Sequence, residues 1–110
     1  MTNKREQFRL EYPAPDRPTL EALTYKLEVL DLSESGLKFA CPERLQVKPG
    51  QPLQGRLVFR DGSVCEVEGK VLRCVKPQLQ VQCVVLLTRG VSLAKMLEEQ
   101  RLLIRKYKPG

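Results

Sequence analysis

The sequence predicts a small, mainly β domain: an antiparallel barrel of five or six strands, with a flexible arm before it and an α-helix after it. Apolar and polar residues alternate through several short segments between residues 23 and 85. Turn-forming pairs such as Pro49-Gly50 and Asp61-Gly62 separate these segments, and near the C-terminus the apolar spacing changes to three and four. Because the connections are short, neighbouring strands are expected to pair antiparallel and close into a barrel.

Residues 1–18 are predicted to form the arm. Pro13, Pro15 and Pro18 lie close together, and proline interrupts both helices and strand pairing. Prolines and charges leave the arm little to bury, so we expect it to become ordered when a ligand binds. A solvated arm without any function is the alternative.

The barrel is assigned to residues 19–91. Its first strand is expected to place Leu23, Tyr25, Leu27 and Val29 on one side, as a half-buried strand requires. The further predicted strands cover residues 37–40, 53–59, 64–75 and 79–85.

Residues 92–110 are the last part of the same single domain. Apolar residues three and four apart predict an amphipathic helix over residues 92–107, with Ser92 as its N-cap. Arg105 and Lys106 fall in its last turn, where cations favour the helix dipole. The apolar stripe of this helix either seals the barrel or docks a partner or a second copy of the chain.

The composition disfavours an enzyme. The chain has no histidine, so the commonest general base and the commonest metal ligand are both missing, and no recognisable nucleophile motif is present. We expect neither a cofactor nor a metal. The four cysteines, Cys41, Cys65, Cys74 and Cys83, lack zinc-site spacing and are interpreted as reduced core thiols.

Charge and hydropathy bear on location and partners. No apolar run is long enough to cross a bilayer and the first residues are polar, so a cytoplasmic protein without membrane insertion is expected. The formal net charge of +6 favours an anionic partner. A nucleic-acid-binding small barrel is disfavoured, because it needs exposed aromatic side chains and the chain has three Phe and three Tyr, several in core-like positions.

Two short motifs stand out. Arg5-x-x-x-Arg9 lies in the arm, and Asp31-x-Ser33-x-x-Gly36 follows the first strand. The same arginine spacing recurs at residues 56–60 and 101–105, so the first pair is distinguished by its place upstream of the second motif. Together the motifs resemble the signature of the PilZ domain, a family of bacterial receptors for the second messenger cyclic di-GMP.

The resemblance covers nearly the whole chain and implies a six-stranded barrel with an N-terminal arm and a C-terminal helix. It implies a non-catalytic receptor that binds cyclic di-GMP through Arg5, Arg9, Asp31, Ser33 and Gly36 and signals to an unidentified downstream protein. In this family a basic residue before the first arginine, here Lys4, accompanies binding of cyclic di-GMP as an intercalated dimer. A PilZ-like interaction module without nucleotide binding is the alternative, and the chain is expected to be a monomer or a weak homodimer.

The chemistry of these side chains suits such a ligand. An arginine fork can hold a phosphate, bond to guanine O6 and N7 or stack on a purine, while Asp31 can accept from the N–H groups of guanine. Ser33 can bond to a base or a phosphate, and Gly36 permits positive φ and close approach of the backbone to the ligand. Lys4 and Arg17 are weaker candidates for contact. The alternative interpretation of residues 31–36 is a simple turn, in which the Asp and Ser side chains bond to local backbone and Gly takes the left-handed position.

Overall fold

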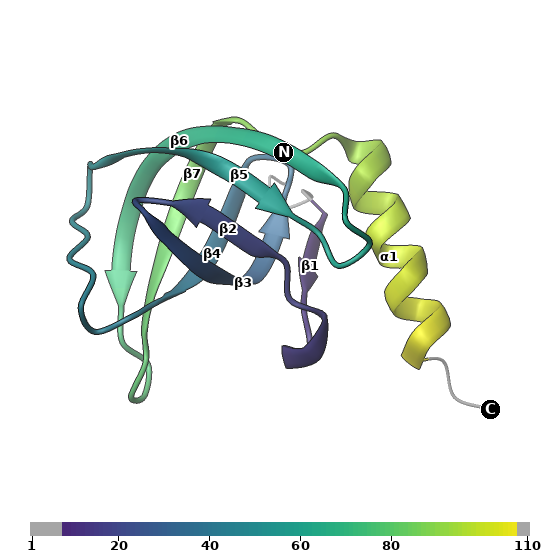
Figure 1. The fold of residues 1–110 in the computed structure, drawn as a ribbon, viewed down its shortest axis with the longest axis horizontal. Helices are drawn as coiled ribbons and strands as arrows, with labels where there is room; N and C mark the ends of the chain where they lie inside the picture. Colours follow the sequence, from purple (N-terminus) through teal and green to yellow (C-terminus); the bar gives the residue numbers. More distant parts are fainter. Residues whose placement is uncertain (1–7, 108–110) are drawn as a thin grey trace, which may run out of the picture.

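Seven strands and one α-helix make up the part of the chain that the structure, a computed structural model, describes, which is residues 8–107. The α-helix is α1 (Leu93–Tyr107), and a short 3-10 helix, η2 (Ala14–Asp16), follows the first strand (Figure 1). The strands are β1 (Arg9–Glu11), β2 (Thr19–Ala22), β3 (Tyr25–Ser33), β4 (Gly36–Cys41), β5 (Pro52–Val58), β6 (Val64–Val75) and β7 (Val81–Arg89).

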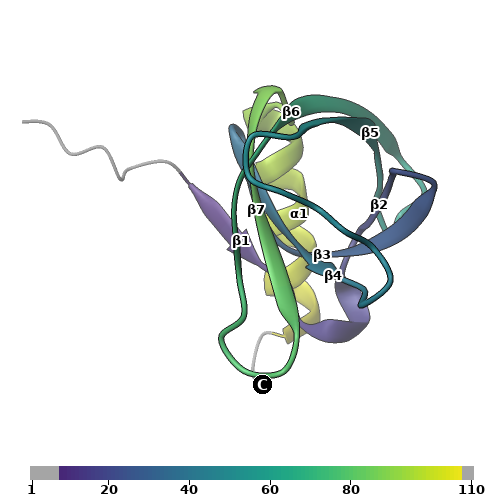
Figure 2. The same cartoon turned by 90° about the vertical axis from the view of Figure 1, so that its left-hand side faces the viewer.

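Six of these strands form a closed antiparallel barrel. Around the ring the order is β3, β2, β5, β6, β7 and β4, and pairing between β3 and β4 closes it (Figure 2). β1 adds a seventh strand outside the ring by pairing with the end of β3. The first half of β3 pairs with β2, so its second half is available to lie between β1 and β4. The predicted barrel with a C-terminal helix is confirmed.

Alternation along the strands places the apolar side chains inside the barrel. In β5, Leu53 and Leu57 are buried, whereas Arg56 between them is exposed. The largest side chains that are fully buried are Phe39, Leu20, Leu27, Leu32, Leu37, Leu57 and Met96. Met96 is contributed by α1, so the helix belongs to the same core as the barrel.

The first predicted strand is wrong at its start, because Leu23 and Thr24 form a turn. Their φ angles are 55° and 63°, and the flanking residues Ala22 and Tyr25 are paired in register. A two-residue hairpin turn with positive φ at both central positions normally uses Asn or Gly. Because neither residue occurs here, the sequence gives no turn signal, and the short strand β2 before the turn is also missed.

The expectation that the arm contains no paired strand is wrong for β1. Arg9 lies opposite Ser33 and Glu11 opposite Asp31, and the intervening Leu10 is buried. The prolines begin at residue 13, after this strand, so they do not prevent its pairing. The described part of the arm is therefore held against the barrel. The last strand was also predicted too early, because β7 begins at Val81 and Leu79 is 90% exposed.

The N-terminal end of α1 is capped as predicted. The backbone N–H of Lys95 donates to the Ser92 hydroxyl at 3.1 Å. Further along, Met96 is completely buried, and the buried Glu99 carboxylate accepts a hydrogen bond of 2.8 Å from the Tyr12 hydroxyl. These contacts attach α1 to the chain just after β1.

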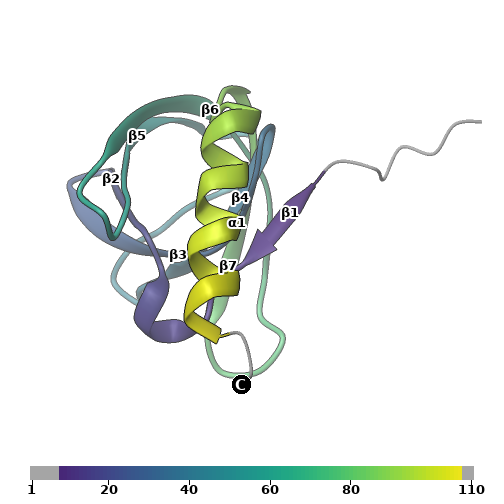
Figure 3. The same ribbon diagram turned by 90° about the vertical axis from the view of Figure 1, so that its right-hand side faces the viewer.

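The C-terminal end of α1 is attached to the same segment. Lys106 Nζ lies 2.7 Å from Asp16 Oδ1, and the Tyr107 hydroxyl donates to the other oxygen of this carboxylate. Figure 3 shows α1 lying along one side of the barrel with its last turn beside η2. The segment between β1 and β2 is thus fixed to the helix at Tyr12 and at Asp16.

The two interpretations of the apolar helix stripe apply to different residues. Met96 packs into the barrel, whereas Leu93, Leu97 and Ile104 are 48%, 39% and 55% exposed. Packing against the barrel is therefore confirmed for part of the stripe, and docking of a partner by the rest stays a prediction.

All four cysteines are free thiols. Cys41 and Cys83 are buried as predicted, while Cys65 and Cys74 are partly exposed. Between residues 8 and 107, no helix has both the length and the apolar character needed to cross a membrane.

Candidate functional site

Four of the six predicted site residues lie in the described structure, and local pairing brings them together. Arg9 begins β1, Asp31 and Ser33 end β3, and Gly36 begins β4. Because Ser33 lies opposite both Arg9 and Gly36, the two motifs become neighbours across three strands. The spacing of the second motif follows from this hairpin, in which two residues connect β3 to β4.

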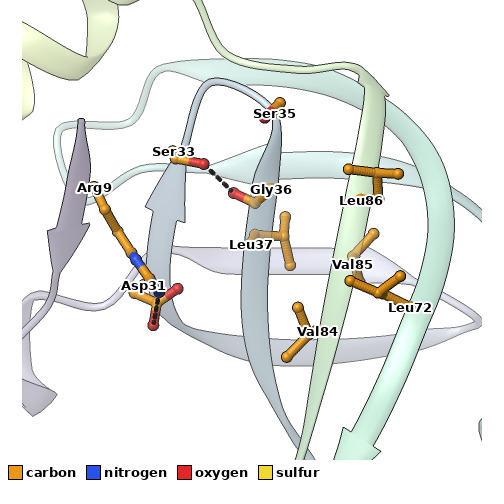
Figure 4. A pocket seen from close by; sticks show the side chains of 10 residues that line it. All are labelled: Arg9, Asp31, Ser33, Ser35, Gly36, Leu37, Leu72, Val84, Val85 and Leu86. Atoms are coloured by element: carbon orange, nitrogen blue, oxygen red, sulfur yellow. Dashed lines mark hydrogen bonds and ion pairs between the residues drawn. The ribbon is translucent and has the colours of Figure 1, made fainter. Parts of the chain in front are cut away.

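All four residues line one open cavity of about 450 Å³ on the outside of the barrel. Ligand sites typically enclose about 300–1,000 Å³, so the cavity has room for a nucleotide. Arg9 and Asp31 point toward one another at one side, and apolar side chains from β6 and β7 lie at the other (Figure 4). The remaining lining residues are Ser35, Leu37, Leu72, Val84, Val85 and Leu86.

Two cations lie near one carboxylate at the polar side of the cavity. Asp31 Oδ2 is 3.9 Å from Arg9 Nη1 and 3.5 Å from Lys38 Nζ. Both distances exceed the roughly 2.7–2.9 Å of a short charge-assisted hydrogen bond. The Asp31 side chain is 10% exposed, whereas that of Arg9 is 55% exposed. The guanidinium group therefore reaches into solvent while its carboxylate partner is fixed in the wall.

Lys38, which lies next to Asp31 without lining the cavity itself, was missed by the sequence reasoning. It follows Gly36 by two residues, so it lies on the same face of β4. In the antiparallel pairing of β3 with β4, it lies directly opposite Asp31. The signal that could have found it is this alternation, which places every second residue after the motif glycine on the outer face.

Ser33 and Gly36 shape the turn at the edge of the cavity. The Ser33 hydroxyl donates to the Gly36 carbonyl at 3.3 Å. Gly36 does not use the positive φ that glycine permits, because among the described glycines positive φ occurs at Gly50 and Gly62. A Cβ at Gly36 would instead lie 3.2 Å from the Val85 carbonyl oxygen of the neighbouring strand. Glycine therefore serves close packing between β4 and β7 and leaves the cavity floor open.

The apolar side of the cavity was also missed. Leu72 and Leu86 are 49% and 50% exposed, and Val84 is partly exposed beside them. A sequence signal exists, because residues 84–87 form a continuous apolar run in a strand that should alternate. Half of that run must face outward, and an exposed apolar group beside charged residues is typical of a binding surface.

The remaining sequence candidates are Lys4, Arg5 and Arg17. Lys4 and Arg5 fall outside the described residues, so their convergence with Arg9 stays a prediction. Arg17 does not line the cavity, and its guanidinium lies 3.6 Å from the Glu28 carboxylate. Within residues 8–107, no group of three or more Cys, Asp or Glu side chains could hold a metal ion.

The family model described as the PilZ domain matches residues 3–107. No curated protein matches the chain in sequence. A solved structure of the PilZ domain of YcgR from Escherichia coli with c-di-GMP is similar, with 16% identity, a TM-score of 0.72, and coverage of 98% of this chain and 100% of that one.

Two longer solved proteins share the fold. The inhibitor of motility MotI/DgrA from Bacillus subtilis has 11% identity and a TM-score of 0.68, with coverage of 99% of this chain and 54% of that one. YcgR from Escherichia coli in complex with c-di-GMP has 15% identity and a TM-score of 0.68, with coverage of 96% and 46%. The chain thus spans about half the length of each of these proteins.

Proposed function

We propose that this chain, which belongs to the PilZ domain family, is a non-catalytic cytoplasmic receptor for cyclic di-GMP (c-di-GMP). One observation carries the proposal: Arg9, Asp31, Ser33 and Gly36 line a single open cavity although they come from two separate motifs. Similarity of fold to the c-di-GMP-bound PilZ domain of YcgR supports the choice of ligand.

The two ends of the cavity suit the two parts of this ligand. Cyclic di-GMP carries two phosphates and two guanines. The exposed Arg9 guanidinium can bind a phosphate or the O6 and N7 edge of guanine, and Lys38 adds a second cation nearby. The Asp31 carboxylate can accept hydrogen bonds from guanine N–H groups. Leu72 and Leu86 offer an apolar surface for the face of a purine ring.

The arm would complete the site. In this proposal residues 1–7 close over the dinucleotide, so that Arg5 binds beside Arg9. Because β1 leads directly into Tyr12, which hydrogen-bonds to Glu99, a shift of β1 would be transmitted to α1. A partner protein would then read the altered surface of α1, where Leu93, Leu97 and Ile104 are exposed.

The stoichiometry proposed is two molecules of c-di-GMP per chain, bound as an intercalated dimer. Two stacked molecules bring four phosphates into one small site, so Lys4 beside Arg5 would reduce their mutual repulsion. Lys4→Leu is expected to shift the ratio from two ligands per chain toward one. A titration of the unmodified chain that ends at one ligand would contradict this stoichiometry and leave the receptor proposal intact.

The proposal is tested by calorimetric titration of the full chain with c-di-GMP. GTP and the linear diguanosine dinucleotide serve as controls, because both carry guanine and phosphate groups without the cyclic backbone. We expect saturable binding of c-di-GMP and much weaker binding of both controls. If c-di-GMP does not bind, the chain is instead a PilZ-like interaction module, and the exposed stripe of α1 becomes its main candidate surface.

A further inference from the structure

Two thiols face each other between β6 and β7. Cys74 and Cys83 are direct partners in the antiparallel register, and their sulfur atoms are 3.4 Å apart. Directly opposed residues in such a pair have Cα atoms about 4.5–5.5 Å apart, and a disulfide accepts about 4.4–6.8 Å. The sulfurs need to approach by roughly 1.4 Å to reach the length of a disulfide bond. The backbone therefore already suits a cross-link.

The third thiol of this cluster is less well placed. Cys41 lies near Cys83, but in the register Cys83 is opposite Phe39 and Cys41 is opposite Val81. Cys41 and Cys83 are thus diagonal neighbours, whose Cα atoms are about 7–8 Å apart in an antiparallel pair, beyond the usual disulfide range. The direct pair is the one that can close without moving a strand.

The two sulfurs of the pair differ in access to solvent. Cys83 is completely buried, whereas Cys74 is partly exposed and its Sγ lies 3.6 Å from the Val47 carbonyl oxygen. Burial raises the pKa of the Cys83 thiol. An oxidant in solution therefore meets Cys74 first, and Cys83 is the neighbour that can react with the oxidised sulfur.

We propose that Cys74 and Cys83 form a reversible intramolecular disulfide when the chain meets a hydroperoxide such as hydrogen peroxide. The Cys74 thiolate attacks one peroxide oxygen, the O–O bond breaks, and the leaving hydroxide takes a proton to become water. The Cys83 sulfur then attacks the Cys74 sulfenic acid, the S–O bond breaks, and the proton of Cys83 leaves with hydroxide as a second water. Two electrons pass from the thiol pair to the peroxide.

The cross-link lies beside the apolar side of the cavity. Val84 follows Cys83 directly, and Leu72 precedes Cys74 by two residues, and both line the cavity. Oxidation thus covalently joins β6 and β7, the two strands that carry the apolar side of the cavity. It also closes the hairpin around residues 76–80, which restricts the unfolded chain, so the melting temperature of the oxidised chain should rise by several degrees.

Thiol counting on the full chain tests the proposal. Reduced protein and protein treated with hydrogen peroxide are each denatured, alkylated and analysed by intact and peptide mass spectrometry. We expect four alkylated cysteines in the reduced chain, but two, Cys41 and Cys65, after peroxide. Treatment with a thiol reductant should restore four. A chain that keeps four reactive thiols after peroxide, or forms a Cys41–Cys83 or intermolecular link, overturns the proposal.

Two serine variants separate the pair from general thiol oxidation. Cys74→Ser should keep its three remaining thiols alkylatable and show no rise in melting temperature after peroxide. Cys65→Ser is the matched control, because Cys65 is also partly exposed but its Sγ lies 3.8 Å from the Gly90 carbonyl oxygen rather than beside another thiol. It should still lose two thiols. Loss of the disulfide in Cys65→Ser, or its persistence in Cys74→Ser, overturns the assignment.

Discussion

Two sides of the barrel use charged residues in different ways. On the side of α1, polar partners are at hydrogen-bond distance: Tyr12 and Glu99 at 2.8 Å, and Lys106 and Asp16 at 2.7 Å. At the cavity, Arg9 and Lys38 stay 3.9 Å and 3.5 Å from Asp31. The comparison indicates that the first group of charges holds the fold, while the second is less tightly paired and, in the proposed receptor, available to a ligand.

The largest effect expected is on the helix side. Met96→Ala removes a completely buried side chain of the shared core, so it should lower the free energy of unfolding by about 2–5 kcal/mol. Leu97→Ala is the matched control. Leu97 is next to Met96 in the sequence but its side chain is 39% exposed, so this substitution should change the free energy of unfolding by less than about 0.5 kcal/mol. Denaturant unfolding measures both. Equal effects of the two variants would contradict the orientation of α1.

The next effect is on binding at the cavity. Arg9→Ala removes an exposed guanidinium from the proposed ligand contact, so it should weaken c-di-GMP binding by about 10- to 100-fold. Its thermal unfolding should hardly change, since exposed substitutions cost less than about 0.5 kcal/mol. Calorimetry and a melting curve on the same sample measure the two quantities.

Arg56→Ala is the matched control for Arg9→Ala. The two side chains are equally exposed, at 54% and 55%, but Arg56 is bonded to Glu21 at 2.9 Å on another pair of strands. It should retain the affinity of the unmodified chain. If both variants bind equally well, Arg9 is not part of the site.

A smaller effect tests the link between the two sides. Tyr12→Phe removes the hydroxyl that donates to Glu99, so stability should fall by about 1–2 kcal/mol. The pKa of this Tyr12 hydroxyl is raised, mainly by burial and then by Glu99, so it stays protonated as a donor through the neutral range. In an NMR titration of this variant, ligand-induced shifts in α1 should shrink while those of residues 31–37 remain. Unchanged shifts in α1 would argue against transmission through Tyr12.

The smallest effect concerns pH. Hydrogen bonds from Ser63 and then Lys95 lower the pKa of Asp61 to about 2. Because this folded-state pKa lies below the unfolded value of about 3.9, Asp61 stabilises the fold above about pH 4, and this contribution is lost as the pH falls toward 2. The side chain is 35% exposed, so screening keeps the contribution below about 1 kcal/mol.

Comparison with Asp61→Asn isolates this contribution. The difference in unfolding free energy between the unmodified chain and the variant should shrink between about pH 4 and pH 2. Urea unfolding at each pH measures it. A difference that is constant with pH would show that Asp61 stabilises the turn without its charge.

The barrel was predictable because its strands alternate and its turns use Pro-Gly and Asp-Gly. The errors lie where backbone geometry overrides residue preference. Leu23 and Thr24 take positive φ without the residues that normally signal it. β1 pairs with β3 because the buried Leu10 contributes to the core, a tertiary contact that local sequence does not show.

The part of the candidate site that the two motifs form was predictable from the sequence. Arg9, Asp31, Ser33 and Gly36 converge as the motifs suggested. Alternation after Gly36 and the apolar run at residues 84–87 could have indicated Lys38 and Leu86, but the position of Leu72 and Leu86 beside the motifs depends on which strands meet across the barrel. Gly36 does not use the positive φ that glycine permits, and a Cβ there would lie 3.2 Å from the Val85 carbonyl oxygen, so its small size favours close packing of β4 against β7.

The most direct test of the central claim is an amide-detected NMR titration of the full chain with c-di-GMP. If the cavity is the binding site, the largest shifts belong to residues 9, 31–38 and 84–86, and Arg9→Ala reduces them at equal ligand concentration. If the ligand instead shifts residues at the last turn of α1 while residues 31–38 stay unchanged, the cavity is not the binding site and the account is contradicted.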